Sequence, residues 1–409
     1  MKVKRLGFIK NKGDCVACTA CYSVCPTQCI KMVPDEEGFL YPMVALDNCI
    51  SCGKCKEVCP IAEKESRNLN YSQEAYCLVT KDKNIWQRST SGGAFSEICK
   101  VYADQETLIC GAAWNGLSVV HKSIIGTSEL ELLCKSKYVA SSLNNNFFQI
   151  KEHLQKGKKV IFAGTPCQVA GLKKFLNKSY KNLLLVDLIC HGVGSPKVFF
   201  SCIKELEDQF QKKILSYEFR SKREVYEGDY IQKIKFISDE EEYIFDDPYI
   251  QLFLSQKCLR PSCGKNCRFR TVNREGDLTI ADFKGFEQIF PQKVGTKINY
   301  SSVIINSLKG KEILNGLLPK VEWYSCSLSL IKEYNPLFYR HTWFCNEREV
   351  FFKEFIKYPE KTIKKYTHPA KILRKTIKIK IWNMLPVWLR KIIILYIFKN
   401  KLWRKLKNK

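Results

Sequence analysis

Two cysteine runs, CVACTACYSVCP at residues 15–26 and CISCGKCKEVCP at residues 49–60, decide how the first part of this chain folds. Each run places three cysteines at steps of three, then a fourth cysteine four positions later, followed directly by proline. This spacing is typical of a segment that holds two [4Fe-4S] clusters. Zinc is the alternative, but zinc sites usually present two CxxC pairs separated by a long spacer. We therefore predict two iron–sulfur clusters.

The ligands of the two clusters are expected to be exchanged between the runs. Three thiolates on one loop can reach three corners of a cluster, whereas the helix that follows carries the fourth cysteine to the other cluster. Cluster one is expected on Cys15, Cys18, Cys21 and Cys59, and cluster two on Cys49, Cys52, Cys55 and Cys25. The second run repeats the first at an offset of 34 positions, as in a duplicated half-ferredoxin. We predict an α+β ferredoxin-like two-cluster module over residues 1–65, with a hairpin around Gly38.

Composition indicates a reducing compartment and more than one core. The chain has 21 cysteines in 409 residues, and oxidised pairing would destroy the ligand sets. It opens MKVKRLGFIKNKG, without the apolar region of a signal peptide, so we expect a cytoplasmic location. With 45% hydrophobic residues, the part after the cysteine runs is long enough to form further domains.

After a polar linker at residues 62–73, apolar runs alternate with helical periods. Strands are predicted at 75–80, 108–114, 159–163, 183–189, 214–219, 230–238, 278–282 and 302–306, and helices at 93–102, 248–255 and 310–317. The strand, turn, helix and strand over residues 159–189 form a right-handed βαβ unit. This part of the chain is predicted to be an α/β domain with a mixed sheet.

Further cysteines recur at distinctive places on this scaffold. Cys167 lies in GTPCQ, where a strand ends and a helix begins, and Cys190 ends the next strand in DLICHG. Adjacent parallel strands place their carboxyl ends side by side, where α/β folds bind cofactors. Cys258, Cys263 and Cys267 follow in one Pro/Gly loop. A third metal site and a set of unrelated buried thiols are both compatible with this pattern. Eight other cysteines are expected to be core thiols: Cys29, Cys77, Cys99, Cys110, Cys134, Cys202, Cys326 and Cys345.

Several of these motifs, in this order and spacing, carry a family resemblance. The motifs are SGG at 91–93, SKY at 136–138, GKKVIFAGTPCQVAGLK at 157–173, DLICHGVGSP at 187–196, LRPSC at 259–263 and GDLTIADFKG at 276–285. Over roughly residues 10–350 the chain resembles the beta subunit of coenzyme F420 hydrogenase/dehydrogenase, fused to a two-cluster ferredoxin domain. The resemblance implies a region like the N-terminal part of that beta subunit over 74–155 and a domain like its C-terminal part over 156–350. It also implies a third [4Fe-4S] cluster on Cys167, Cys190, Cys263 and Cys267, with Cys258 as a reserve ligand.

Members of this family resemble iron–sulfur flavoproteins, so FAD is the further cofactor that the resemblance implies. A flavin would connect a two-electron carrier to clusters that accept one electron at a time. Ser91, Gly92 and Gly93 precede a predicted helix whose N-terminus could bind a diphosphate, and Lys137 lies in a second matching motif. An ordinary helix cap is the alternative role of the Ser/Gly loop. No GxGxxG motif follows a strand, so a Rossmann NAD site is not supported.

Two residues are candidates for acid–base chemistry. His191 follows Cys190 and could move protons or tune a cluster, although a lone histidine is more often a packed residue. Asp282 ends a predicted strand and could contact cofactor or substrate, or form a turn. No convincing Ser-His-Asp arrangement is present, so the predicted chemistry is redox.

The last 50 residues carry much of the net charge of +26. Residues 360–409 hold 16 Lys and Arg against one acidic residue, interleaved with Ile, Leu and Trp. This pattern predicts a basic amphipathic helical tail on an anionic membrane surface, or docked on a partner. Its longest uncharged runs, 381–389 and 392–398, are both too short to span a bilayer. Packing on the protein body and nucleic-acid binding are the alternatives, and the nucleic-acid alternative is disfavoured.

These observations favour an iron–sulfur, flavin-dependent oxidoreductase. A reduced carrier of the ferredoxin, deazaflavin or flavin type would supply electrons to FAD and the clusters, and a small organic acceptor would be reduced. The alternative is a non-enzymatic subunit that relays electrons to a redox partner protein, and this role needs no flavin. A cytoplasmic enzyme peripheral to the inner face of the membrane is expected.

Overall fold

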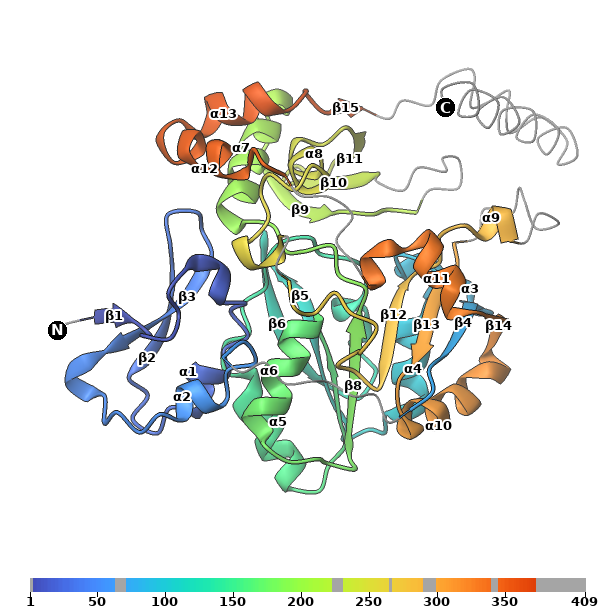
Figure 1. Cartoon of the computed structure of the whole chain (residues 1–409). Coiled ribbons are helices and arrows are strands. Elements are labelled where there is room, and N and C mark those ends of the chain that lie inside the picture. The colour runs from blue at the N-terminus through green and yellow to red at the C-terminus, as the bar shows by residue number, and fades with distance from the viewer. Residues whose placement is uncertain are drawn as a thin grey trace, which may run out of the picture.

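The computed structural model describes residues 3–62, 71–222, 231–264, 267–289, 299–339 and 345–372. Figure 1 shows an N-terminal module at the left, a central part built on a large sheet, and an upper layer. Within these described ranges, every helix is too short or too polar to cross a membrane.

The N-terminal module consists of a small sheet, two short helices and two 3-10 turns. The sheet is antiparallel with strand order β1-β3-β2. The elements are β1 (Val3–Arg5), η1 (Lys12–Asp14), α1 (Ala20–Val24), β2 (Ile30–Pro34), β3 (Leu40–Ala45), η2 (Leu46–Asn48) and α2 (Lys54–Glu57). β2 and β3 pair in register from Ile30 with Val44 to Pro34 with Leu40, which confirms the predicted hairpin around Gly38.

The central sheet has eight strands in the order β14-β4-β13-β12-β8-β7-β5-β6. Its strands are β4 (Glu74–Thr80), β5 (Leu108–Asn115), β6 (Ser118–Ile125), β7 (Val160–Ala163), β8 (Leu183–Leu188), β12 (Leu278–Asp282), β13 (Ser301–Ile305) and β14 (Val321–Cys326). β5, β7, β8 and β12 are parallel neighbours, and the outer strands are antiparallel. The predicted mixed sheet and its strands are confirmed.

Helices cover both faces of this sheet. α5 (Asn146–Gln155) and α6 (Pro166–Leu176) pack on one face, and α4 (Ala94–Tyr102) and α10 (Leu308–Leu317) pack on the other. Side chains of β7 point alternately to the two faces: Val160 and Phe162 pack with α5 and α6, and Ile161 packs with α4 and α10. Shorter elements border this part: α3 (Lys83–Arg88), η3 (Leu130–Leu133), η4 (Pro261–Cys263), α9 (Phe286–Ile289), η6 (Leu318–Lys320), α11 (Leu328–Tyr334) and η7 (Pro336–Phe338).

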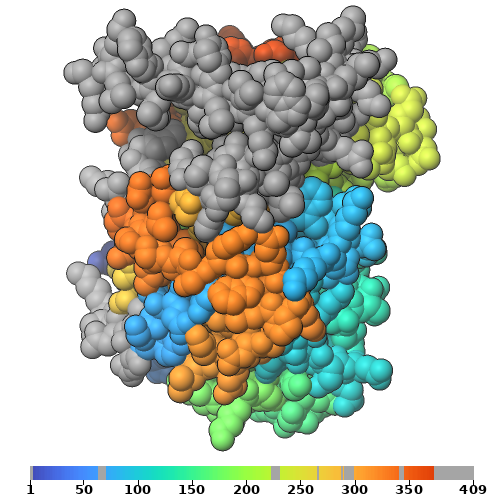
Figure 2. All heavy atoms as spheres, turned by 90° about the vertical axis from the view of Figure 1, so that its right-hand side faces the viewer, coloured from blue at the N-terminus to red at the C-terminus, as the bar shows by residue number. Residues whose placement is uncertain are grey.

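The predicted βαβ unit is present as β7, α6 and β8, with β7 and β8 parallel. Segments distant in sequence pair at one edge of the sheet, where β4 lies next to the edge strand β14. Their register runs from Thr80 paired with Val321 to Ala75 paired with Cys326. Figure 2 shows this face, with blue atoms of the earlier segment beside orange atoms of the later one. In the middle of the sheet, β7, β8 and β12 are adjacent and parallel, so their carboxyl ends lie side by side.

The upper layer follows β8 and is completed by the end of the described chain. It contains α7 (Pro196–Phe210), β9 (Ile214–Glu218), β10 (Gln232–Phe236), β11 (Glu241–Phe245), α8 (Pro248–Leu254), α12 (Arg348–Lys357), α13 (Pro359–Tyr366) and β15 (Lys371–Ile372). The sheet order is β15-β11-β10-β9, and all its pairs are antiparallel. Aromatic side chains from α12, such as Phe351 and Phe355, are fully buried in this layer.

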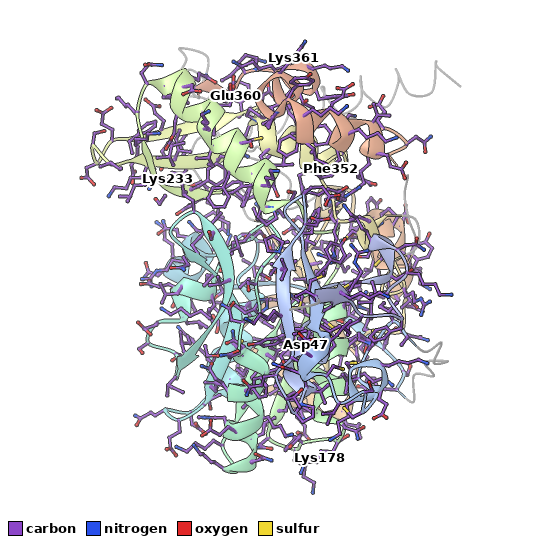
Figure 3. All side chains as sticks on the ribbon, turned by 90° about the vertical axis from the view of Figure 1, so that its left-hand side faces the viewer. Asp47, Lys178, Lys233, Phe352, Glu360 and Lys361 are labelled. Carbon is purple, nitrogen blue, oxygen red and sulfur yellow. The ribbon has the colours of Figure 1, made fainter. Side chains whose placement is uncertain are left out.

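The first part of the predicted basic tail belongs to this upper layer. Glu360 forms an ion pair with Lys204 of α7, and Ile363 on α13 is fully buried. Figure 3 labels Glu360 and Lys361 in this layer and Asp47 in the N-terminal module. The remainder of the predicted helical tail, residues 373–409, lies outside the described residues.

Candidate metal centres

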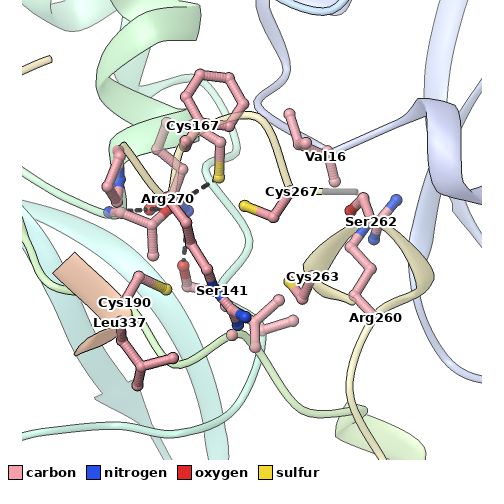
Figure 4. Close-up of a pocket in the computed structure, with 18 of the residues that line it drawn as sticks. Val16, Ser141, Cys167, Cys190, Arg260, Ser262, Cys263, Cys267, Arg270 and Leu337 are labelled. Atoms are coloured by element: carbon pink, nitrogen blue, oxygen red, sulfur yellow. Dashed lines mark hydrogen bonds between the residues drawn. The ribbon is translucent and has the colours of Figure 1, made fainter. Parts of the chain in front are cut away.

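Four cysteine thiols line one cavity of about 50 Å³ beside the carboxyl ends of the parallel strands. Cys167 lies in the first turn of α6, Cys190 follows β8, Cys263 ends η4, and Cys267 lies on the loop beyond it. Figure 4 shows their four sulfur atoms pointing toward the same space. The structure therefore brings together the four residues predicted to hold a third cluster.

Local sequence explains how these thiols are positioned. Thr165 caps α6 in a capping box with Gln168, and Pro166 occupies the first helical position, so the helix begins beside Cys167. Gly192 has φ +132°, and a Cβ atom there would lie 2.9 Å from the Leu259 Cδ1 atom. Only glycine lets this loop approach the loop of Cys263 so closely.

Burial and mutual repulsion disfavour the charged thiolate form of three of these cysteines. Burial raises the pKa of Cys190 to about 12, and burial also raises the pKa values of Cys167 and Cys263. Negative charge on neighbouring thiols raises these pKa values further. Four adjacent thiolates therefore need positive charge among them, which the irons of a cluster supply.

The N-terminal thiols form two further groups. Cys15, Cys18, Cys21 and Cys59 line a second cavity of about 20 Å³, the set predicted for cluster one. Burial raises the pKa of Cys18 to about 12, and charges on Cys59 and Cys15 contribute. Three of the thiols predicted for cluster two lie close to one another, because charge on Cys52 and Cys49 raises the pKa of Cys55, behind burial as the main cause. The fourth, Cys25, lies 3.4 Å from Cys29, on which charge from Cys49 also acts. Cys52 is exposed, so this second group lies at the protein surface.

Only a thin layer of protein separates the first group of thiols from the third. Val16 and Ala17 line both cavities. Gly171, one helical turn after Cys167 on α6, packs against Cys18, and its Cβ position lies 2.5 Å from the Cys18 Cβ atom. The predicted cluster one and the predicted third cluster are therefore neighbours across a single layer of protein.

A buried arginine lies between these two groups. Arg260 is 2% exposed, and its guanidinium donates to the backbone oxygens of Cys15 (2.8 Å) and Leu40 (2.9 Å) and stacks over Tyr41. It forms no ion pair with a carboxylate of the described residues. A buried unpaired cation is costly. Anionic clusters on both sides would supply the missing negative charge, so the residues present fit such groups.

The two acid–base candidates lie close to the four-thiol cavity. His191 is half-buried, its ring centroid lies 5.0 Å from that of Phe253, and its buried Nε2 atom has no hydrogen-bond partner among the described residues. Burial, together with the charge of Arg270, lowers the pKa of His191 to about 4. Asp282 ends β12 beside the strand that leads to Cys190, and it forms an ion pair with Arg220.

The predicted cofactor loop has structural roles of its own. The Gly92 amide donates to Ser301 Oγ at 2.9 Å, and a Cβ atom on Gly92 would lie 2.2 Å from the Leu78 oxygen. The Gly92 amide is therefore already used, and its lack of a side chain is explained by packing. Gly93 has φ +88° and precedes α4, which fits a helix cap.

Basic side chains gather beside this loop. Lys222 donates to the Ser91 oxygen and lies 4.0 Å from the centre of the Trp86 ring. Burial lowers the pKa of Lys222 to about 7 and that of Lys137 to about 8. The ammonium groups of Lys137 and Lys222 donate to backbone oxygens and, in the described ranges, form no ion pair with a carboxylate. Together with the buried Arg220, these half-buried lysines form a cationic face, which sequence patterns did not reveal as a unit.

Most of the cysteines expected in cores are buried there. Cys29 is one of these core thiols, and it also has a thiol neighbour, since its Sγ atom lies 3.4 Å from Cys25 Sγ. Cys258, the reserve ligand, does not line the four-thiol cavity; it is fully buried, and its charge raises the pKa of Cys202, behind burial as the main cause. Cys110 is a core thiol, as predicted.

Among the described residues, no three His, Cys, Asp or Glu side chains are grouped to hold a metal ion. A [4Fe-4S] cluster spaces its four thiolates around a larger body, so this finding is compatible with cluster sites.

Comparisons with known proteins agree with the sequence motifs. Residues 14–62 match the 4Fe-4S dicluster domain, and residues 157–323 match the model for the C terminus of the coenzyme F420 hydrogenase/dehydrogenase beta subunit. Among curated proteins, none matches this chain. A similar solved structure is a chain of the xenon-derivatised F420-reducing [NiFe] hydrogenase complex from Methanosarcina barkeri, 15% identical with a TM-score of 0.41. That alignment covers 72% of this chain and 91% of the other. These two models confirm the predicted resemblance over the residues that they match: residues 14–62 are similar to a 4Fe-4S dicluster domain, and residues 157–323 are similar to the C-terminal part of the coenzyme F420 hydrogenase/dehydrogenase beta subunit.

Proposed function

We propose that this protein is an electron-transfer protein with three [4Fe-4S] clusters, held by the two N-terminal groups of thiols and by the four-thiol cavity. The observation that carries the proposal is the adjacency of two thiol-lined cavities, which share Val16 and Ala17 and flank Arg260. Clusters transfer single electrons, and short separations through packed protein favour transfer between them.

The arrangement defines an order for the three clusters. The third cluster would be held deepest, by Cys167, Cys190, Cys263 and Cys267. Cluster one follows across the contact between Gly171 and Cys18. Cluster two, beside the exposed Cys52, lies nearest the surface and is the natural point of exchange with a redox partner protein or a reduced carrier.

A flavin at the cationic face would complete the protein as an oxidoreductase. FAD carries a diphosphate, and Lys137, Lys222 and Arg220 are basic groups that could neutralise it, with the Ser91–Gly93 loop beside them. When bound, a flavin exchanges two electrons with an organic molecule and one with a cluster. Asp282 would hold Arg220 in place, and His191 could hold a proton near the third cluster.

Two functions follow from the presence or absence of that flavin. With FAD, the protein would be an enzyme that passes electrons between a reduced carrier, the clusters and a small organic acceptor. Without FAD, it would be a subunit that relays electrons to a partner enzyme. The unneutralised charge of Lys137 and Lys222 favours the flavin-dependent enzyme.

The test is anaerobic purification of the full chain, followed by iron counting and flavin extraction. The parent should carry about twelve irons, and Cys167→Ser or Cys190→Ser should lower this to about eight, because the N-terminal clusters use other thiols. Cys110→Ser, a core thiol, is the matched control and should retain all the iron. Unchanged iron in both ligand variants would exclude the third cluster, and no extractable flavin would favour the relay function.

We also propose that residues 373–409 bring the protein to an anionic membrane surface. The basic residues of this segment are interleaved with Trp382, Trp388 and Trp403, and each cation near an anionic leaflet contributes on the order of 1 kcal/mol. The deletion that tests this must follow Ile372, because α13 and β15 are part of the upper layer. The full chain should co-sediment with anionic vesicles and be released by salt. Equal sedimentation of the truncated chain would exclude this role of the tail.

A further inference from the structure

The N-terminal module contains one thiol more than its two clusters need. Cys29 is buried, and its Sγ atom lies 3.4 Å from the Sγ atom of Cys25, the predicted fourth ligand of cluster two. Either sulfur can donate the hydrogen in this contact. Charge on Cys25 and on Cys49, another predicted ligand of cluster two, also acts on Cys29. The extra thiol therefore lies beside two of the predicted ligands of that cluster.

The backbone fixes Cys29 at this place. Gln28 adopts a left-handed conformation with φ +51°, and its amide donates to the Cys25 oxygen at 3.2 Å, which closes a tight turn between the two cysteines. The Cys29 oxygen accepts from the Ala45 amide at 2.8 Å, immediately before β2 begins. The hydrogen bond to Ala45 thus fixes Cys29 to the sheet, and the turn at Gln28 brings its side chain close to Cys25.

Two thiols at this separation compete for one metal position. Each iron of a [4Fe-4S] cluster binds three inorganic sulfides and has room for one protein thiolate. Cys25 and Cys29 lie too close together to occupy two separate corners of the cluster, whose ligands surround a larger body. They can serve only the same iron, one at a time.

We propose that Cys29 is an alternative ligand for the iron of cluster two that Cys25 binds, a proposal that rests on the presence of cluster two in the proposed function. In the exchange, the bond from iron to Cys25 breaks and a bond from iron to Cys29 forms. The proton of the Cys29 thiol moves to the released Cys25 thiolate across the sulfur contact. No electron is gained or lost, and the charge of the cluster with its ligands is unchanged.

The sequence repeat supplies an internal control for this proposal. The fourth cysteine of the second run, Cys59, corresponds to Cys25, and the position that corresponds to Cys29 is Glu63. The repeat therefore supplies no second thiol beside Cys59. The spare ligand belongs to the cluster that includes the exposed Cys52, where loss of iron to solvent is easiest.

The experiment compares iron content and low-temperature EPR spectra of the full chain reconstituted anaerobically. Cys25→Ala should retain the iron of the parent, whereas Cys59→Ala should lose between about one and four irons, because a cluster lacking a ligand loses one iron or falls apart. Cys25→Ala/Cys29→Ala should lose as much as Cys59→Ala, and Cys29→Ala alone should equal the parent.

Each contrary result has a distinct meaning. Equal iron loss in Cys25→Ala and in the double variant would overturn the proposal, and so would iron loss in Cys29→Ala alone. Unchanged iron in the double variant would overturn it as well. If the parent itself lacks N-terminal cluster iron, the proposed function fails instead. The EPR signal of the third cluster, whose ligands are untouched, shows that each variant is folded.

Discussion

One substitution at the contact between Gly171 and Cys18 should strain the packing of the N-terminal module against α6. Gly171 lies in the middle of α6, on the same side as Cys167 one turn earlier. A Cβ atom at Gly171 would lie 2.5 Å from Cys18 Cβ and 2.8 Å from Cys18 Sγ. Gly171→Ala therefore places a methyl group against a predicted ligand of cluster one.

The expected cost follows from these distances. Carbon atoms pack at about 3.5–4.0 Å, so α6 and the Cys18 loop must separate by about 1 Å. Overpacking of this kind costs about 1–3 kcal/mol, and the better helix propensity of alanine offsets about 1 kcal/mol. We expect the free energy of unfolding to fall by about 0–2 kcal/mol. We also expect a changed EPR signal for cluster one, because the strain falls on its ligand.

Thermal unfolding, iron counts and EPR spectra of the anaerobic protein measure these effects. Gly316→Ala in α10 is the matched control, because it gains the same helix propensity and its new methyl group meets only the Val101 side chain, at 2.8 Å. A signal of cluster one identical to that of the parent in Gly171→Ala would refute the reasoning. It would mean that the module and α6 are not held in the contact described.

Three further predictions concern buried charges. Arg260→Met should lower the reduction potentials of cluster one and the third cluster by tens of millivolts in an EPR-monitored titration. This is the effect of removing one unit charge at about 10 Å with a dielectric constant of about 20. Arg260→Lys, which keeps the positive charge, should have potentials close to those of the parent. Asp187→Asn should cost about 3–5 kcal/mol in denaturant unfolding, because it leaves the fully buried Arg274 unpaired; a midpoint equal to that of the parent would contradict this. Retention of FAD should weaken as the pH rises through about 7 to 8, because Lys222 and Lys137 lose their protons there; a flat profile in ultrafiltration across this range would exclude them as the anion-binding groups.

Local patterns were enough to predict much of the fold. Short apolar runs such as residues 183–189 predict buried parallel strands, and β8 lies there. The sequence GTPCQ predicts a strand end, a turn and a helix start, and the structure has the capping box of Thr165 at that place. The cysteine spacings predicted that Cys15, Cys18, Cys21 and Cys59 would lie together, whereas the set of Cys167, Cys190, Cys263 and Cys267 came from the family resemblance.

The features that sequence reasoning missed are contacts between distant segments. The sequence shows Gly171 only as a glycine within a predicted helix, and its contact with Cys18, far earlier in the chain, is visible only in the folded structure. Arg260 reads as one basic residue among many, and only the tertiary structure shows that it is buried without a carboxylate among the described residues. Cys29 lies in a core, as predicted, but its four-residue distance from Cys25 does not reveal the left-handed turn at Gln28 that brings the two thiols together.

The same buried groups link folding to cluster assembly. Without metal, burial keeps thiols such as Cys167 and Cys190 protonated at neutral pH, because it raises their pKa values. The guanidinium of Arg260 then remains a buried cation that forms no ion pair with a carboxylate of the described residues, which disfavours the folded arrangement. Assembly of the proposed clusters would convert the thiols to thiolates and supply the missing negative charge, so that binding energy would become folding energy for the region that joins the module to the body. The protein should therefore dock its N-terminal module firmly only when iron and sulfide are available, which makes electron transfer between the clusters conditional on their assembly.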